Sequence, residues 1–140
     1  MILAFAIGDV CGEDFLNTGN YVAETTRDII SPALVPAMIF LISCFIAFST
    51  GTSWGTFAIM LGIAIPLATA MDTNISLAIA AVLGGGIFGD HCSPTSDTSV
   101  ISSMASASDH IDHIRTQLPY ALIGGTITVI LYLILGFLGV

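Results

Sequence analysis

The chain has 140 residues, of which 55% are apolar and only 9% are charged. A soluble domain carries about 25% charged residues, so this composition excludes a water-soluble globule with a fully solvated surface. The net charge is −8 and the only basic residues are Arg27 and Arg115, which excludes a basic surface for binding nucleic acid.

The charged side chains are confined to a few segments of the chain. None lies between Asp28 and Asp72, between Asp72 and Asp90, or after Arg115. Long apolar stretches without charge are typical of helices that cross a membrane. We therefore predict an all-α integral membrane protein.

The N-terminal region combines a short apolar run with a polar stretch. Residues 1–8 are too few to cross a hydrocarbon core about 30 Å thick, so we interpret them as the end of a truncated helix. From Gly8 to Pro32 the chain is polar, which predicts a water-facing loop with one short helix at the membrane interface.

Two apolar stretches, 33–48 and 56–70, flank a polar segment at 49–56. This segment holds two glycines and five hydroxyl side chains, which make a poor helix interior. Each arm has about 15 residues, fewer than a full span needs. We therefore predict a re-entrant helical hairpin over 33–70, with a non-helical tip at 49–56.

The segment 75–106 repeats this design. An apolar helix over 75–88 is expected to end in three glycines, and small residues resume a helix over 99–106. Pro94 lies in the polar stretch between them and cannot donate a backbone hydrogen bond. We predict one broken transmembrane helix that is non-helical at 89–97.

A polar loop over 108–116 is expected to follow and to lie in water. Residues 118–140 carry no charge and would extend roughly 34 Å as a helix. They are predicted to be the last transmembrane helix.

The two polar breaks are the candidate functional site. Non-helical backbone at membrane depth must pack in protein or line a wet cavity, and paired broken helices mark transporter binding sites. We therefore expect the breaks to meet. The second break supplies two carboxylates, Asp90 and Asp97, and an acid inside the membrane is functional by default. The alternatives are that Asp97 only caps the following helix, or that Asp90 lies at the water interface.

An oxygen-only set of ligands suits a hard cation such as Na⁺. Both acids can face one cavity with Ser93, Ser96, Thr98 and the hydroxyls of the 49–56 segment. A proton and a metal cation compete for the same carboxylate, which predicts cation/proton exchange. We expect Asp97, ranked level with Asp90, to be essential: Asp97→Asn should abolish exchange, whereas Asp112→Asn should cost little.

Histidines suggest an alternative of another class. His91 with Cys92, and His110 with His113, could form a transition-metal site in a membrane metalloprotein. Their spacing matches neither H-E-x-x-H nor paired C-x-x-C motifs. We therefore predict a transporter rather than an enzyme, with no cofactor and no resident metal. A small structural subunit without transport activity is a further alternative.

Three stretches resemble the C-terminal part of the NhaC-type Na⁺/H⁺ antiporters. They are FSTGTSWGTFAIMLGIAIPLA (48–68), GGGIFGDHCSPTSDTSVISS (84–103) and DHIDHIRTQLPYAL (109–122). The resemblance implies a fold of two inverted repeats, each with a hairpin and a broken helix, and residues 1–140 would form the second repeat as a single unit. It implies Na⁺ and H⁺ as transported substrates, or coupling to organic acids of the malate and lactate type.

Carried over residue by residue, the resemblance implies a cation site in both breaks. Its residues would be Asp90, Ser93, Ser96, Asp97 and Thr98 in the broken helix, and Thr50, Gly51, Thr52 and Ser53 at the hairpin tip. Because family members are around three times longer, we expect a fragment, or a short form that needs the missing N-terminal repeat or another chain. Self-association is left open. The expected location is a prokaryotic plasma membrane, in contact with lipid.

Overall fold

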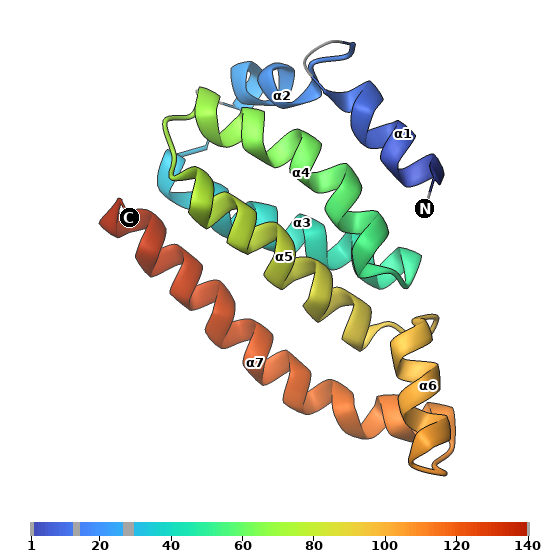
Figure 1. The fold of residues 1–140 in the computed structure, drawn as a ribbon. Coiled ribbons are helices and arrows are strands. Elements are labelled where there is room, and N and C mark those ends of the chain that lie inside the picture. Colours follow the sequence, from blue (N-terminus) through green and yellow to red (C-terminus); the bar gives the residue numbers. More distant parts are fainter. Residues whose placement is uncertain (1, 13–14, 27–29, 140) are drawn as a thin grey trace.

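The computed structural model describes residues 2–12, 15–26 and 30–139. All regular secondary structure within these residues is helical (Figure 1). The elements are α1 (Ile2–Cys11), α2 (Thr18–Thr26), the 3-10 helix η1 (Pro32–Leu34), α3 (Val35–Thr50), α4 (Ser53–Ala70), α5 (Ile75–Cys92), α6 (Asp97–Ala105) and α7 (His110–Leu138).

Within the described ranges, four segments are long and apolar enough to cross a membrane. They are Pro32–Thr50, Ser53–Ala70, Ile75–Cys92 and His110–Leu138. The prediction of an all-α membrane protein is therefore confirmed.

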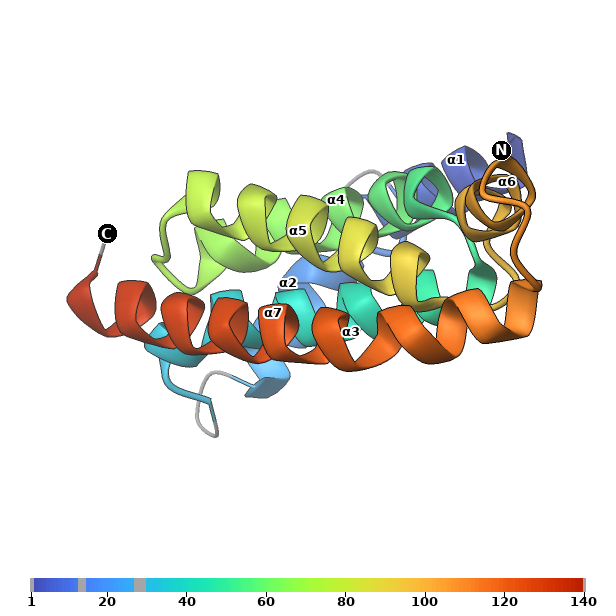
Figure 2. The same cartoon turned by 90° about the horizontal axis from the view of Figure 1, so that it is seen from below.

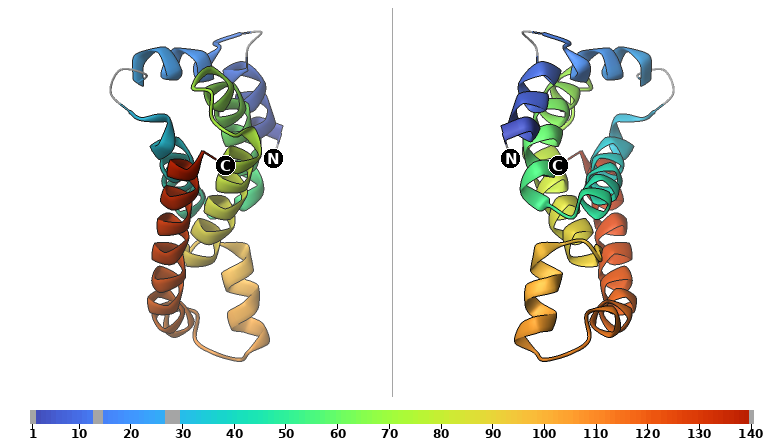
Figure 3. Two further views of the ribbon diagram at one scale, coloured as in Figure 1. Left: turned by 90° about the vertical axis from the view of Figure 1, so that its left-hand side faces the viewer. Right: turned by 90° about the vertical axis from the view of Figure 1, so that its right-hand side faces the viewer.

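Helix α5 is central to the arrangement, since it contacts α3, α4 and α7. Helix α7 runs along α3 and α5, and α1 and α2 pack against α4 (Figures 1 and 2). Helix α6 extends beyond the bundle at the end where α5 finishes, and it returns the chain to the start of α7 (Figure 3).

Glycines allow α5 to lie directly against α3. A Cβ atom at Gly85 would meet the Phe40 carbonyl oxygen and would lie 2.9 Å from Ser43 Cβ. At Gly89 it would meet the Cys44 carbonyl oxygen. Small residues four apart permit such close approach between membrane helices. The prediction that the helix ends at the glycines is therefore wrong: α5 continues to Cys92, and these glycines serve packing rather than termination.

The polar tip of the hairpin is much shorter than predicted, because only Gly51 and Thr52 are non-helical. Gly51 ends α3 with a left-handed φ of 67°, and Thr52 caps α4 by accepting a hydrogen bond from the Gly55 N–H at 3.5 Å. The hydroxyls of Ser49 and Thr50 donate to carbonyl oxygens four residues earlier, so they are satisfied within the helix.

The prediction of a re-entrant hairpin was based on two helical arms that are each shorter than a full transmembrane span. Helices α3 and α4 have 16 and 18 residues, and α3 is extended by η1. At about 1.5 Å per residue both approach the thickness of the hydrocarbon core. The length argument for re-entrance therefore no longer holds.

A break separates α5 from α6, but it covers only residues 93–96 rather than the predicted 89–97. Asp90 and His91 remain helical at the end of α5, and Asp97 already belongs to α6.

The loop predicted over 108–116 is also largely helical. Asp109 caps α7 by accepting the backbone N–H groups of Ile111 at 2.9 Å and Asp112 at 3.3 Å, so the helix begins at His110. Helix α7 has 29 residues and is about 43 Å long, which exceeds a bilayer core.

Helices α1 and α2 form the N-terminal part of the described chain. Helix α1 extends beyond the predicted 1–8, and α2 is the one short helix expected before Pro32. The charged residues Glu13, Asp14, Arg27 and Asp28, together with Met1 and Val140, lie outside the described residues.

Candidate cation site

The hairpin tip and the break between α5 and α6 meet, as predicted. Both lie at the same end of the bundle (Figure 1). A Cβ atom at Gly51 would lie 2.7 Å from Thr95 Oγ1 and 2.9 Å from the Thr95 carbonyl carbon and oxygen. Gly51 therefore packs directly against the backbone of Thr95 in the break.

Asp90 is the buried carboxylate of this region, with 3% of its surface exposed. It lies in the last turn of α5, one turn after Gly86, where an added Cβ atom would meet the Phe57 ring of α4. Its Oδ2 accepts a hydrogen bond from Thr98 Oγ1 at 3.3 Å. Its Oδ1 is buried and has no hydrogen-bond partner in the described part of the chain. Among the residues that the structure describes, the neutral hydroxyl of Thr98 is thus the one hydrogen-bond donor to this buried carboxylate.

Hydroxyl groups connect the break residues to one another. Ser96 Oγ lies 2.7 Å from Thr98 Oγ1, which joins Asp90, Thr98 and Ser96 in one chain of hydrogen bonds. Ser93 is fully buried, and its Oγ lies 3.0 Å from Thr95 Oγ1. The structure therefore brings four of the five predicted break residues into two short hydroxyl networks.

Asp97 differs from Asp90 in its surroundings. It occupies the first turn of α6, where a negative charge is favoured by the helix dipole, and its side chain is exposed. No hydrogen bond joins it to Asp90 among the described residues. The structure therefore separates two acids that the sequence ranked together.

The predicted tip residues take different positions. Gly51 is buried against Thr95, while Thr52 and Ser53 are half-buried at the start of α4. Thr50 is exposed and its hydroxyl is bonded within its own helix.

Two hydroxyl residues of this region were missed at the level of sequence. Thr95 contacts the tip, and Ser99 donates to the His91 carbonyl oxygen at 3.3 Å, which ties α6 to the end of α5. The sequence signal for Thr95 and Ser99 was the near-continuous run of hydroxyl residues from Ser93 to Ser99. Residue type alone does not single out any one position within this run.

His91 and His110 form hydrogen bonds with backbone carbonyl groups. His110 Nε2 donates to the Pro94 carbonyl oxygen at 2.9 Å, and Nδ1 lies 3.2 Å from Ser103 Oγ. His110 is half-buried. His91 Nδ1 bonds to the Ile87 carbonyl at 3.0 Å. The residues described here contain no cluster of three or more potential metal ligands.

Comparison with known proteins identifies relatives of the chain. The model of the Na⁺/H⁺ antiporter family matches residues 1–137. An uncharacterized protein of Haemophilus influenzae is 41% identical over 138 residues, which cover 98% of this chain and 26% of that protein. The malate-2H(+)/Na(+)-lactate antiporter of Bacillus subtilis is 34% identical, over 79% of this chain and 24% of its own.

The Na(+)/H(+) antiporter NhaC of Alkalihalophilus pseudofirmus is 36% identical, over 77% of this chain and 23% of its own. The chain therefore spans about a quarter of the length of the curated relatives it matches, less than the third expected from the resemblance. No solved structure matches the chain.

Proposed function

We propose that this chain, which belongs to the Na⁺/H⁺ antiporter family, supplies part of the cation site of a bacterial plasma-membrane exchanger. In this proposal Asp90 binds Na⁺ and H⁺ alternately. The chain is a transporter component rather than an enzyme, and Na⁺ and H⁺ are its cargo rather than cofactors.

The observation that carries the proposal is the unpartnered Oδ1 of Asp90. A buried ionised carboxylate is costly unless a counter-charge or several donors stabilise it, and Asp90 has one hydroxyl donor. A bound Na⁺ would supply the missing counter-charge, and a proton would remove the negative charge instead. Because the two cannot occupy the same carboxylate oxygen together, release of one accompanies binding of the other.

The neighbouring groups suit Na⁺ as a ligand set. Ser93, Ser96 and Thr98 present hydroxyl oxygens near the end of α5, and the C-terminal end of a helix carries partial negative charge. Thr52 and Ser53 at the hairpin tip begin α4 beside this region. We infer that the remaining ligands, and the alternating access that exchange requires, come from the missing repeat or another chain.

We expect Asp90→Asn to reduce Na⁺-driven H⁺ movement to background in proteoliposomes that contain the complete exchanger. Asparagine keeps the shape of the side chain but neither binds a proton in this pH range nor carries the charge that holds Na⁺. The matched control is Asp72→Asn, because Asp72 is exposed and its positive φ of 54° is also favourable for asparagine. Exchange that persists in Asp90→Asn with its normal pH dependence would contradict the proposal.

Asp97→Asn is expected to have a smaller effect than Asp90→Asn. An exposed carboxylate at a helix N-terminus helps to attract the cation. Because water and the helix dipole stabilise its negative charge, it does not need Na⁺ or H⁺ to neutralise that charge. We expect exchange to continue with a weaker apparent affinity for Na⁺, which a titration of rate against Na⁺ concentration would measure. Complete loss of exchange at saturating Na⁺ would instead make Asp97 the exchanging acid, as the sequence allowed.

A coupled organic substrate is the second candidate function. Its support is that relatives named as malate/lactate and arginine/ornithine antiporters are 34–35% identical to the chain, and relatives named for Na⁺ and H⁺ are 35–36% identical to it. The same vesicles decide between them, because only a coupled carrier would exchange malate, lactate or arginine against an ion gradient.

A further inference from the structure

We propose that a polar cavity between α5, α6 and α7 is a hydrated vestibule through which cations reach Asp90. This inference rests on the proposed function of Asp90. The cavity has a volume of about 170 Å³. Its lining residues are His91, Thr98, Ser99, Ser102, His113 and Gln117.

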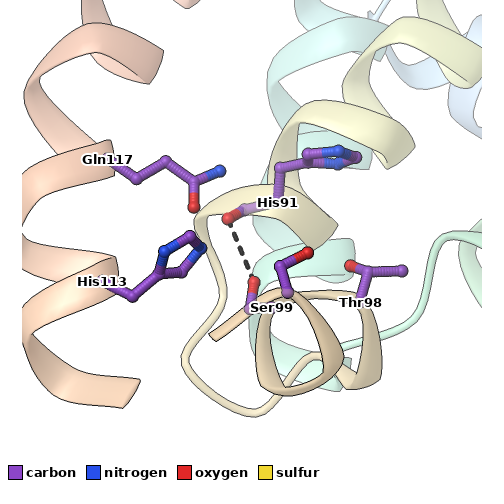
Figure 4. Close-up of a pocket in the computed structure, with 6 residues that line it drawn as sticks. His91, Thr98, Ser99, His113 and Gln117 are labelled. Carbon is purple, nitrogen blue, oxygen red and sulfur yellow. Dashed lines mark hydrogen bonds between the residues drawn. The ribbon is translucent and has the colours of Figure 1, made fainter. Parts of the chain in front are cut away.

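The lining is polar at every position, in a chain that is 55% apolar. Figure 4 shows His113 and Gln117 directed from α7 toward the turn between α5 and α6. Polar side chains in a membrane protein are expensive unless they bond to one another or to water. The volume is enough for about five water molecules, at roughly 30 Å³ each. The cavity therefore suits water and a hydrated ion better than lipid.

Thr98 connects the cavity to the buried acid. It lines the cavity, and its Oγ1 donates to Asp90 Oδ2 at 3.3 Å. Asp90 itself is only 3% exposed and does not line the cavity. Thr98 therefore links the wall of the cavity to the Asp90 carboxylate.

The polar groups of the lining can accommodate a hydrated cation. The lining contains no lysine or arginine, and its hydroxyl and amide oxygens can accept hydrogen bonds from the water molecules around a hydrated cation. The nearest acid in the hydrogen-bond network is Asp90, which lies directly behind Thr98. Thr98 and Ser99 lie in the first turn of α6, where the negative charge of Asp97 opposes the binding of an anion at this helix N-terminus.

The test uses cysteine labelling in the complete exchanger. Ser102→Cys on α6 and Gln117→Cys on α7 are expected to react with a positively charged, water-soluble methanethiosulfonate, above the level of the three native cysteines. The control is Thr126→Cys, because Thr126 lies among Leu122, Ile123 and Ile127 on the apolar face of α7, where we expect lipid. Labelling of the two cavity positions should also block Na⁺-driven H⁺ movement.

The sign of the reagent provides a second readout. After normalisation to each reagent's rate with a small free thiol, the positive reagent should react about 10-fold faster than a negative one, as expected for electrostatic steering. Labelling no faster than at Thr126→Cys, or full exchange after complete labelling, would overturn the vestibule. A preference for the negative reagent would also overturn it as a cation path.

The outcomes separate this inference from the function proposed for Asp90. If labelling blocks exchange but Asp90→Asn does not, the vestibule stands and Asp90 is not the exchanging acid. If Asp90→Asn abolishes exchange while fully labelled protein still transports, the role of Asp90 stands and the vestibule does not. The double variant Asp90→Asn with Ser102→Cys should still label, since water in the cavity does not depend on the charge of Asp90.

Discussion

Replacing Gly51 with alanine is expected to abolish exchange and to destabilise the fold by about 2–5 kcal/mol. Gly51 has a φ of 67°, where a side chain costs about 1–2 kcal/mol. The added methyl would also lie 2.9 Å from the backbone carbonyl of Thr95, so the tip must move away from the break. Overpacking of this kind typically costs a further 1–3 kcal/mol.

Thermal unfolding in detergent and exchange in vesicles would measure the two effects. Gly124→Ala is the matched control, because a Cβ atom there meets nothing within 4 Å and alanine is the better helix former by about 1 kcal/mol. We expect this control to keep its exchange rate and to unfold at the same or a higher temperature. If Gly51→Ala behaves like the control, the tip is not seated on Thr95 in the working protein.

Gly89→Leu is expected to have the second largest effect, because it separates α5 from α3. Even a Cβ atom at this position would meet the Cys44 carbonyl oxygen, and it would lie 2.9 Å from both Ala47 Cβ and the Phe48 backbone nitrogen. These neighbours belong to a helix backbone and cannot rotate away. We expect destabilisation of at least about 3 kcal/mol, at the upper end of the range for overpacked cores.

Separation of the two helices would also displace the last turn of α5, which carries Asp90. We therefore expect exchange to be lost in any Gly89→Leu protein that still inserts into the membrane. Gly124→Leu makes the same change on the open side of α7 and should leave both unfolding temperature and exchange near their original values. Equal behaviour of the two leucine variants would contradict the close packing of α5 on α3.

The sequence predicted those features that depend on local composition. Uncharged apolar stretches indicated membrane helices, since no other regular structure than a helix satisfies the backbone of a single segment in lipid. Gly51 and Pro94 marked the two interruptions, because one supplies a left-handed φ and the other lacks an N–H group. Asp90 was among the expected ligands for the same local reason, as an acid inside an apolar segment.

The extents of the breaks could not be predicted in this way. Hydroxyl side chains at Ser49 and Thr50 weaken a helix when they compete for its backbone, but here they donate to carbonyls one turn earlier and the helix continues. Asp109 was expected in a loop, whereas its carboxylate caps α7. Both outcomes depend on which partner a short polar side chain selects, and composition does not specify that choice.

By itself, the sequence determined that this chain is helical, lies in a membrane and contains two interruptions with oxygen-bearing side chains. Only the tertiary structure distinguished Asp90 from Asp97, since burial depends on which helix face meets a neighbour. Gly85 and Gly89 bring α3 against α5, and Asp90 is buried in the last turn of α5, while Asp97 begins α6 and is exposed. The physical reason is that an acid's environment is set by side chains distant in sequence, which only packing brings together.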